Sequence, residues 1–170
     1  MRHTPTARLG VALLLITSSA CGDDSDDSAK PDTQSLVQSA AESSDEVEYL
    51  NADPATTSPY SDAVRVGSTL YLAGNLGLDA AGKIVKGGIK GQAEQMMQNL
   101  KKVLEANGSS LDRVANCEVM LADINERDAF NEVYAKFWEP GRFPARHAFG
   151  VTGLYLGVRV EIACVAVATS

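Results

Sequence analysis

One short segment in the last third of the chain combines apolar residues with a fixed positive charge. Residues Phe143 to Gly150 read FPARHAFG, with Arg146 where a strand would begin. A guanidinium keeps its proton, so a buried Arg146 needs an anionic partner, either an Asp or Glu of the protein or a carboxylate of a ligand. Its planar fork can hold both oxygens of such a carboxylate. An ion pair between subunits and an arginine that reaches solvent at a strand end are the structural alternatives.

Few other residues have the side chains and spacing of a reactive site. His147 is the single histidine beyond residue 21, and in a strand it would point away from Arg146, so we interpret it as structural. Cys117 and Cys164 lie on apolar faces of strand-like segments. An oxidising compartment would permit a disulfide between them, but buried cysteines are more often free, and we expect free thiols. Without a spaced Cys/His cluster, we expect no metal and no other cofactor.

The elements that must position these residues follow from hydrophobic spacing. Apolar residues recur at intervals of three and four over 89–107 and about 126–138, which predicts two helices. After a short extended piece at 49–50, β-rich runs predict strands at 63–66, 69–73, about 83–85, 115–122, 146–152 and 158–168. We therefore expect one α+β domain, a mixed sheet with two helices on one face.

The second face of that sheet has no covering element. The expected domain offers no third helix, and segment 158–168 is apolar on both of its faces. We therefore expect the domain to associate with further copies of itself through the open sheet face.

The first 21 residues have the pattern of an export signal. Arg2 and Arg8 precede an almost purely apolar run from Leu9 to Ile16, which is far shorter than the roughly 18 apolar residues of a membrane-spanning helix. Cys21 follows small residues, as in a bacterial lipoprotein signal whose cysteine is lipidated, although Ser18 stands where leucine is usual. A plain signal peptide is the alternative. We expect an exported protein of the periplasm or cell envelope, anchored to the membrane by lipid at Cys21.

Residues 22–48 separate this signal from the expected domain at 49–170. They include nine acidic residues, one lysine and no aromatic residue, a composition that predicts a disordered tether. Of the net charge of −7, residues 49–170 carry 12 basic and 13 acidic side chains, which leaves −1 for the domain. A domain so close to neutral is a poor candidate for binding nucleic acid.

Six segments, in order, resemble the RidA family of reactive intermediate deaminases, also called the YjgF or L-PSP family. They are SPYSDAV at 58–64, LYLAGNLGLD at 70–79, GQAEQMMQNLKKVLEANG at 91–108, VANCEVMLADINERDAFNEVYAKFW at 114–138, FPARHAFGV at 143–151 and VRVEIACVAV at 158–167. The resemblance covers the whole expected domain. It implies a homotrimer of chorismate-mutase-like subunits, with binding sites in the clefts between subunits.

The resemblance also implies which residues line the site. Arg146 matches the family arginine that holds a ligand carboxylate, and Tyr60 matches a loop tyrosine over the pocket. Where family members have Ser-Gly-Gln, this chain has Ala73-Gly74-Asn75, which keeps the glycine and a carboxamide but loses the hydroxyl. The family's backbone donor two residues beyond the arginine falls on Ala148.

One position departs from the family's catalytic pattern. The glutamate of the last strand that positions or activates water in the deaminases aligns with Ala163. Glu161 matches an earlier glutamate on the same face, displaced by about 6.6 Å because each strand residue rises about 3.3 Å. Proton transfer needs contact at about 2.6–3.2 Å or one bridging water, so Glu161 would need a different substrate pose or a second water to replace it.

Two functions from different classes fit these residues. The first is hydrolysis of reactive enamines or imines, converting 2-imino acids to 2-keto acids and ammonia, with Arg146 on the carboxylate and Tyr60 and Asn75 orienting the imine or the water. The second is a non-catalytic module that binds small carboxylates at the cell envelope, which the absent glutamate and the export signal favour. Ribonuclease activity, credited to some family members, would need a basic stripe or a histidine pair, and residues 49–170 have neither.

Overall fold

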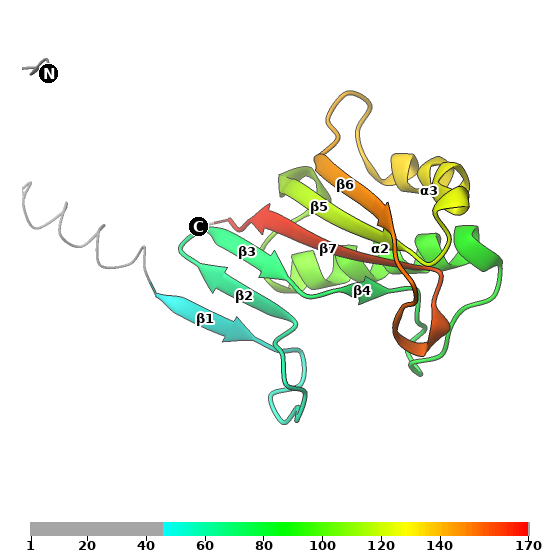
Figure 1. Cartoon of the computed structure of the whole chain (residues 1–170). Helices are drawn as coiled ribbons and strands as arrows, with labels where there is room; N and C mark the ends of the chain where they lie inside the picture. Colours follow the sequence, from blue (N-terminus) through cyan, green and yellow to red (C-terminus); the bar gives the residue numbers. More distant parts are fainter. Residues whose placement is uncertain (1–45, 170) are drawn as a thin grey trace, which may run out of the picture. The chain divides into compact units, whose positions relative to one another are not determined.

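The computed structural model describes residues 46–169, in which a seven-stranded sheet packs one face against two helices (Figure 1). The strands lie in the order β1-β2-β3-β7-β5-β6, and β4 also pairs with β7. Among these pairs β5–β6 is parallel and the others are antiparallel. The elements are β1 (Val47–Leu50), β2 (Ala63–Val66), β3 (Thr69–Leu72), β4 (Asn75–Leu76), α2 (Gly88–Ala106), β5 (Val114–Leu121), α3 (Arg127–Tyr134), β6 (Ala145–Gly150) and β7 (Val160–Val167). The predicted α+β class is confirmed.

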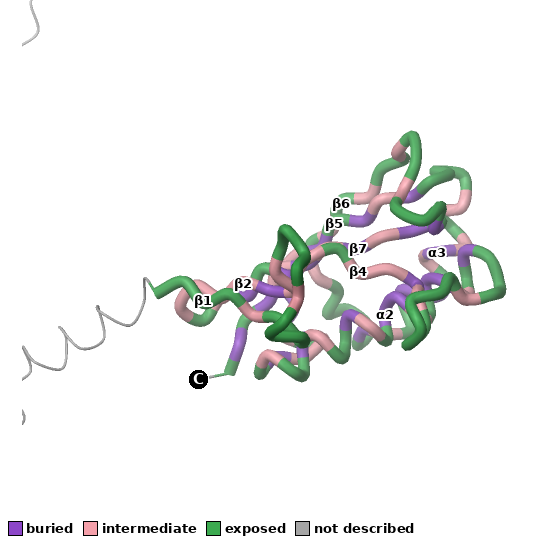
Figure 2. The backbone as a smooth tube through the Cα atoms, turned by 90° about the horizontal axis from the view of Figure 1, so that it is seen from below, coloured by how far each residue is buried: buried purple, intermediate pink, exposed green. Residues whose placement is uncertain are grey.

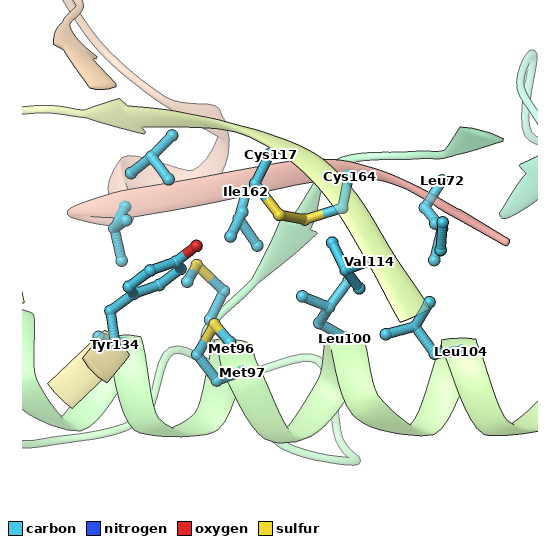
Figure 3. Packing of buried hydrophobic residues seen from close by; sticks show 14 of the residues in the cluster. Leu72, Met96, Met97, Leu100, Leu104, Val114, Cys117, Tyr134, Ile162 and Cys164 are labelled. Atoms are coloured by element: carbon cyan, nitrogen blue, oxygen red, sulfur yellow. A yellow bond between two sulfur atoms is a disulfide. The ribbon is translucent and has the colours of Figure 1, made fainter. Parts of the chain in front are cut away.

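The long helix α2 covers one side of the hydrophobic core. Its apolar residues at spacings of three and four are buried, except for the half-buried Val103, and they face Ile162 of β7 and Val114 of β5 (Figure 3). Gly108, with φ of +71°, follows its last turn and gives the chain the left-handed conformation that ends many helices. The buried residues of α2 are Ile89, Gln92, Ala93, Met96, Met97, Leu100 and Leu104.

Burial alternates along the central strands, which shows that the helices cover one sheet face alone. In β7 the even-numbered residues from Val160 to Ala166 are buried, whereas Glu161, Ala163 and Val165 are half-buried. Figure 2 shows the same alternation as purple and pink segments. On the uncovered side Tyr71, Phe149 and Val167 remain 51%, 40% and 39% exposed. This face therefore presents large apolar side chains to solvent.

Several boundaries differ from those the sequence predicts. The predicted strand at 83–85 is wrong, because Ile84 makes only an isolated bridge to Leu78, and the chain pairs instead through the two-residue β4. The second helix is shorter than 126–138, since short 3-10 turns at 124–126 and 135–137 flank the eight residues of α3. Strand β1 begins at Val47, two residues before the extended piece predicted at 49–50.

The expectation of free thiols at Cys117 and Cys164 is wrong. The two cysteines form a disulfide between β5 and β7, on the sheet side that faces α2 (Figure 3). They are directly opposite each other in the antiparallel register, with their Cα atoms 4.1 Å apart. The sequence placed both on apolar faces, but only the strand order brings β7 beside β5 and makes them partners.

Reducing this disulfide should destabilise the domain. A bond that closes a loop of this length, between residues 47 apart in sequence, typically contributes about 2–4 kcal/mol to the free energy of unfolding. We expect urea unfolding of the wild type to shift to lower midpoint when a reductant is added. The Cys117→Ala/Cys164→Ala variant, which has no bond to reduce, should show no shift; an unchanged wild-type midpoint would contradict the prediction.

The predicted signal at 1–21, Cys21 and nearly all of the predicted tether lie outside the described residues. Within residues 46–169, no helix combines the length and hydrophobicity that crossing a bilayer requires.

Candidate functional site

Arg146 lies on β6 at the edge of the sheet, and its side chain packs against α3. One terminal nitrogen, Nη2, donates a hydrogen bond to Oδ1 of Asn131 at 2.8 Å. The guanidinium carbon lies 4.5 Å from the ring centroid of Tyr134 and 5.5 Å from that of Phe130. These three α3 residues form one platform because positions three and four apart share a helix face.

No acidic group compensates the charge of Arg146 within the described part of the chain. The ion pairs found there involve other cations, namely Arg65, Lys90, Lys101, Arg142 and Arg159. Burial raises the pKa of Tyr134 to about 12, so the phenol beside the guanidinium is neutral. The half-buried cation lines a cavity of about 370 Å³ with Phe143 and Pro144. An anion that enters this cavity would find the Arg146 guanidinium already positioned to bind it.

A second cavity, of about 600 Å³, contains Tyr60 and a carboxylate. Its walls are formed by Ser58, Tyr60, Ala73, Gly74, Leu76, Tyr155 and Glu161. Glu161 is half-buried, and its side chain forms no hydrogen bond or ion pair with another described residue. Burial raises the pKa of this carboxyl above the ordinary glutamate range. An unpaired carboxyl with a raised pKa in a cavity is suited to accept and donate protons.

Local contacts position both Tyr60 and Glu161 in the Glu161 cavity. Two hydrogen bonds fix the loop that carries Tyr60. The Asp62 carboxylate accepts a hydrogen bond from the Ala52 amide at 2.8 Å, and Asn51 Oδ1 accepts one from the Asp62 amide at 3.0 Å. Gly74 passes so close to Glu161 that a Cβ at that position would overlap with the carboxylate. Glycine at 74 therefore makes the space that Glu161 occupies.

Within one chain, Arg146 and Glu161 lie on opposite sides of the sheet. Arg146 is in register with Cys117, which faces the helices, whereas Glu161 is in register with Met120. Cys117 and Met120 are three residues apart on β5, and side chains alternate between faces along a strand. The structure thus brings Tyr60, Gly74 and Glu161 together but does not bring them to Arg146.

The other predicted residues have varied positions. Asn75 donates through its amide nitrogen to the Ala73 carbonyl at 2.9 Å and does not line the Glu161 cavity. Ala148 packs its methyl group on the core, and its strand β6 pairs on one side with β5. His147 is exposed on the face opposite to Arg146, as the strand alternation predicts.

Two residues of the cavities, Asn131 and Tyr155, were missed in the sequence, and a third, Glu161, was considered but not assigned to the site. Asn131 is a polar residue beside the apolar stripe of α3, at the spacing that places it with Phe130 and Tyr134, and that spacing was the available signal. Glu161 was set aside because the alignment placed the catalytic acid at Ala163, yet Glu161 supplies the carboxylate of the cavity and Ala163 does not line it. Tyr155 follows β6 in a loop, where no periodic pattern indicates which way a side chain points.

The described residues contain no group of three or more His, Cys, Asp or Glu side chains that could hold a metal ion.

Comparison with known proteins gives a consistent result. Residues 50–168 match the family model described as "Endoribonuclease L-PSP". The chain is 44% identical over 115 residues to the 2-iminobutanoate/2-iminopropanoate deaminase of Capra hircus, covering 67% of this chain and 83% of the relative. It is 39% identical over 115 residues to the human protein of the same name, with the same coverage.

Solved structures agree with the sequence relatives. The crystal structure of RidA from an Antarctic Psychrobacter superposes with a TM-score of 0.65 at 36% identity, covering 71% of this chain and 98% of that one. Because the family model spans well over half of the chain and these relatives are matched over most of their length, the chain belongs to the RidA/YjgF/L-PSP family.

Proposed function

We propose that this protein hydrolyses 2-imino acids to 2-keto acids and ammonia. Two observations carry the proposal: the half-buried Arg146 has no acidic partner among the described residues, and the half-buried Glu161 side chain has no hydrogen-bond partner there, each group lining its own cavity. A carboxylate substrate satisfies the first group, and proton transfer uses the second. Relatives named 2-iminobutanoate/2-iminopropanoate deaminase support this reaction class.

The complete site forms between copies of the chain, as a homotrimer would provide. Arg146 and Glu161 lie on opposite sides of one sheet, so one chain cannot direct both at a small substrate. The uncovered sheet face exposes Tyr71, Phe149 and Val167, which supports burial against a second copy. Arg146 of one copy then meets Tyr60 and Glu161 of its neighbour.

The reaction moves two protons from oxygen to nitrogen, and one carboxyl group can carry each of them in turn. With the substrate carboxylate on Arg146, a water oxygen adds to the imine carbon while Glu161 accepts a proton from that water. The proton passes to the imine nitrogen, which gives a carbinolamine. Glu161 then takes the hydroxyl proton of the carbinolamine and delivers it to the amine. The C–N bond breaks, ammonia departs, and the 2-keto acid remains as the product.

The direct test is imine hydrolysis by the purified chain. Threonine dehydratase generates 2-iminobutanoate in place, and keto-acid release is compared with the uncatalysed rate. We expect acceleration proportional to the concentration of the chain. Binding of propionate without any acceleration would overturn the proposal in favour of a non-catalytic carboxylate-binding module.

Replacing Gly74 with alanine should displace the Glu161 carboxylate. The new methyl group would overlap with Glu161 side-chain atoms and not with backbone, so the side chain can move aside at little cost in stability. We expect kcat to fall by about 10- to 100-fold, a part of the effect of a lost general base, with a nearly unchanged urea midpoint. Gly153→Ala is the control, because nothing lies within 4 Å of its added Cβ; equal kcat values for the two variants would contradict the role of Gly74.

Asn131→Asp should separate ligand binding from stability. The substitution places a carboxylate where Asn131 Oδ1 now accepts from Arg146 at 2.8 Å, which neutralises the guanidinium. We expect propionate affinity, measured by calorimetric titration, to fall by about tenfold or more, while the free energy of unfolding stays equal or rises by up to about 1 kcal/mol. Asn131→Ala, which leaves the charge free, should weaken binding less. Unchanged affinity in Asn131→Asp would show that Arg146 does not hold the ligand.

We also infer export and lipid anchoring at Cys21. The sequence of residues 1–21 supports it, and so does the Cys117–Cys164 disulfide, because such bonds persist in oxidising compartments. In a bacterial host, radiolabelled palmitate should label the wild type and not Cys21→Ser. Equal absence of label in both would leave a plain signal peptide as the explanation of the segment.

A further inference from the structure

A strained turn between β6 and β7 places a tyrosine at the Glu161 cavity. Leu156 has φ of +56° and Gly157 has φ of +77°, and the Val158 amide donates to the Tyr155 carbonyl at 3.2 Å. Two positive φ values at the centre of a turn suit glycine or asparagine, so leucine there costs about 1 kcal/mol. Strain of this kind persists where the surroundings enforce it and is common at ligand sites.

The chain on the far side of this turn is firmly anchored. The amide of Arg159 donates to the buried Gln92 side chain at 2.7 Å, and the Arg159 carbonyl accepts from the Ala122 amide at 2.9 Å. The Arg159 guanidinium also donates through Nε to both carboxylate oxygens of Glu126, at 3.0 and 2.8 Å. Val158, between this anchor and the turn, is 1% exposed. Hydrogen bonds and burial therefore hold the chain that follows the turn of Tyr155.

Tyr155 is available for contact with a ligand. Its side chain is 71% exposed, Tyr60 across the same cavity is 62% exposed, and Glu161 between these elements is half-buried. In Figure 1 the turn, drawn in dark orange, lies beside the end of β4. Ala73 and Leu76 supply the other apolar part of the wall. The cavity thus has a carboxyl group with apolar and aromatic surface around it.

The size of this surface exceeds what a small imine can use. The cavity volume of about 600 Å³ in the single chain lies within the range of sites that hold large organic ligands. Aromatic rings bind other rings by stacked or edge-to-face contact, and a tyrosine orders few torsions on binding. Within the cavity of one chain, a methyl or ethyl side chain is too small to cover either tyrosine ring.

We propose that Tyr155 determines substrate specificity by contacting the side chain of the imino acid, and that the preferred substrates are 2-imino acids with aromatic side chains. This inference rests on the proposed deaminase function. The carboxylate and imine carbon of such a substrate take the places already described, and the aromatic ring lies against Tyr155.

The test compares two imines on matched variants. An amino-acid oxidase, with catalase present, generates the imine of phenylalanine or of alanine, and kcat/KM is determined for each. We expect wild type to prefer the aromatic imine and Tyr155→Ala to lower the ratio of the two kcat/KM values by about tenfold. Tyr155→Phe should keep the ratio. Tyr49→Ala removes a tyrosine of similar exposure, 72%, that does not line the cavity, and should also keep it. An unchanged ratio in Tyr155→Ala overturns the inference.

A binding measurement decides the inference even if the chain hydrolyses neither imine. Calorimetric titration with 3-phenylpropionate and with propionate should show tighter binding of the aromatic acid to wild type, and a loss of this preference in Tyr155→Ala. Equal affinities for wild type, or no binding of the aromatic acid, would overturn the role of Tyr155. Absence of imine hydrolysis together with a Tyr155-dependent preference would overturn only the deaminase proposal.

Discussion

Replacing Arg146 with alanine is expected to lower kcat/KM for 2-iminobutanoate by about 10²- to 10⁴-fold. Hydrogen bonds to charged groups contribute about 1.5–3 kcal/mol each, a bidentate contact supplies two, and each 1.4 kcal/mol corresponds to a factor of ten. Most of the loss should be seen in KM, because the substrate carboxylate is present in the ground state and in the transition state alike. Steady-state kinetics and propionate titration measure both effects.

Arg146→Lys is the matched control for this variant. Lysine keeps the positive charge but lacks the planar fork that reaches Asn131 and a carboxylate together, so we expect activity between wild type and Arg146→Ala. The free energy of unfolding of Arg146→Ala should fall by no more than about 1 kcal/mol, the value of the contacts with Tyr134 and Phe130. A folded Arg146→Ala protein with normal KM would show that Arg146 is structural.

Replacing Glu161 with glutamine is expected to lower kcat by about 10²- to 10⁴-fold, the usual contribution of a general acid or base. Glutamine keeps the shape of the side chain beside Gly74 but cannot take a proton from water. KM should change little, because Arg146 remains to bind the carboxylate. A variant with kcat close to wild type would remove Glu161 from the mechanism and make the cavity a binding site alone.

The pH dependence of kcat provides a second test of the role of Glu161. Glu161 must be ionised to accept the first proton, and burial raises its pKa, so kcat should fall with decreasing pH at a pH above the ordinary glutamate value of about 4.3. This acid limb should be absent in Glu161→Gln. The pKa is higher in the folded chain than in the unfolded chain, so ionised Glu161 lowers the free energy of unfolding at neutral pH. Glu161→Gln should therefore be at least as stable as wild type there.

The helices and most strands were predictable because their signals are local. The stripe of α2 buries the residues that its three-and-four spacing indicates, and the hairpin of β2 and β3 follows from two β-rich runs around Gly67 and Ser68. Strand β4 was missed because two residues carry no periodicity, and Ile84 was assigned to a strand on composition alone. The local sequence pattern therefore predicts long helices and strands correctly but does not predict strands of two residues.

Contacts between distant segments were less predictable. The disulfide depends on β7 lying between β3 and β5, in a register that places Cys164 opposite Cys117. Nothing in the spacing of the cysteines encodes that strand order. The same limit applies to Arg146: the sequence indicated an unusual buried cation, but its neutral partner Asn131 became evident only when α3 was packed against β6.

The candidate site was predicted in part. Tyr60 and Gly74 lie in one cavity as the family resemblance implies, whereas Asn75 turns back to its own backbone. Glu161 was judged too far from the catalytic position by counting residues along a strand. Counting along the strand does not show where the loop of Tyr60 lies against the sheet. In the structure this loop lies at Glu161, in the same cavity.

Mixing inactive variants tests most directly whether two copies of the chain build one deaminase site. Arg146→Ala and Glu161→Gln subunits, produced separately and together in equal amounts, are assayed for hydrolysis of 2-iminobutanoate. If each site takes its arginine from one copy and its glutamate from another, about a quarter of the sites in randomly mixed oligomers contain both intact residues. We therefore expect the mixed protein to recover about a quarter of wild-type activity. Activity no higher than that of the two separate variants would contradict a site shared between subunits.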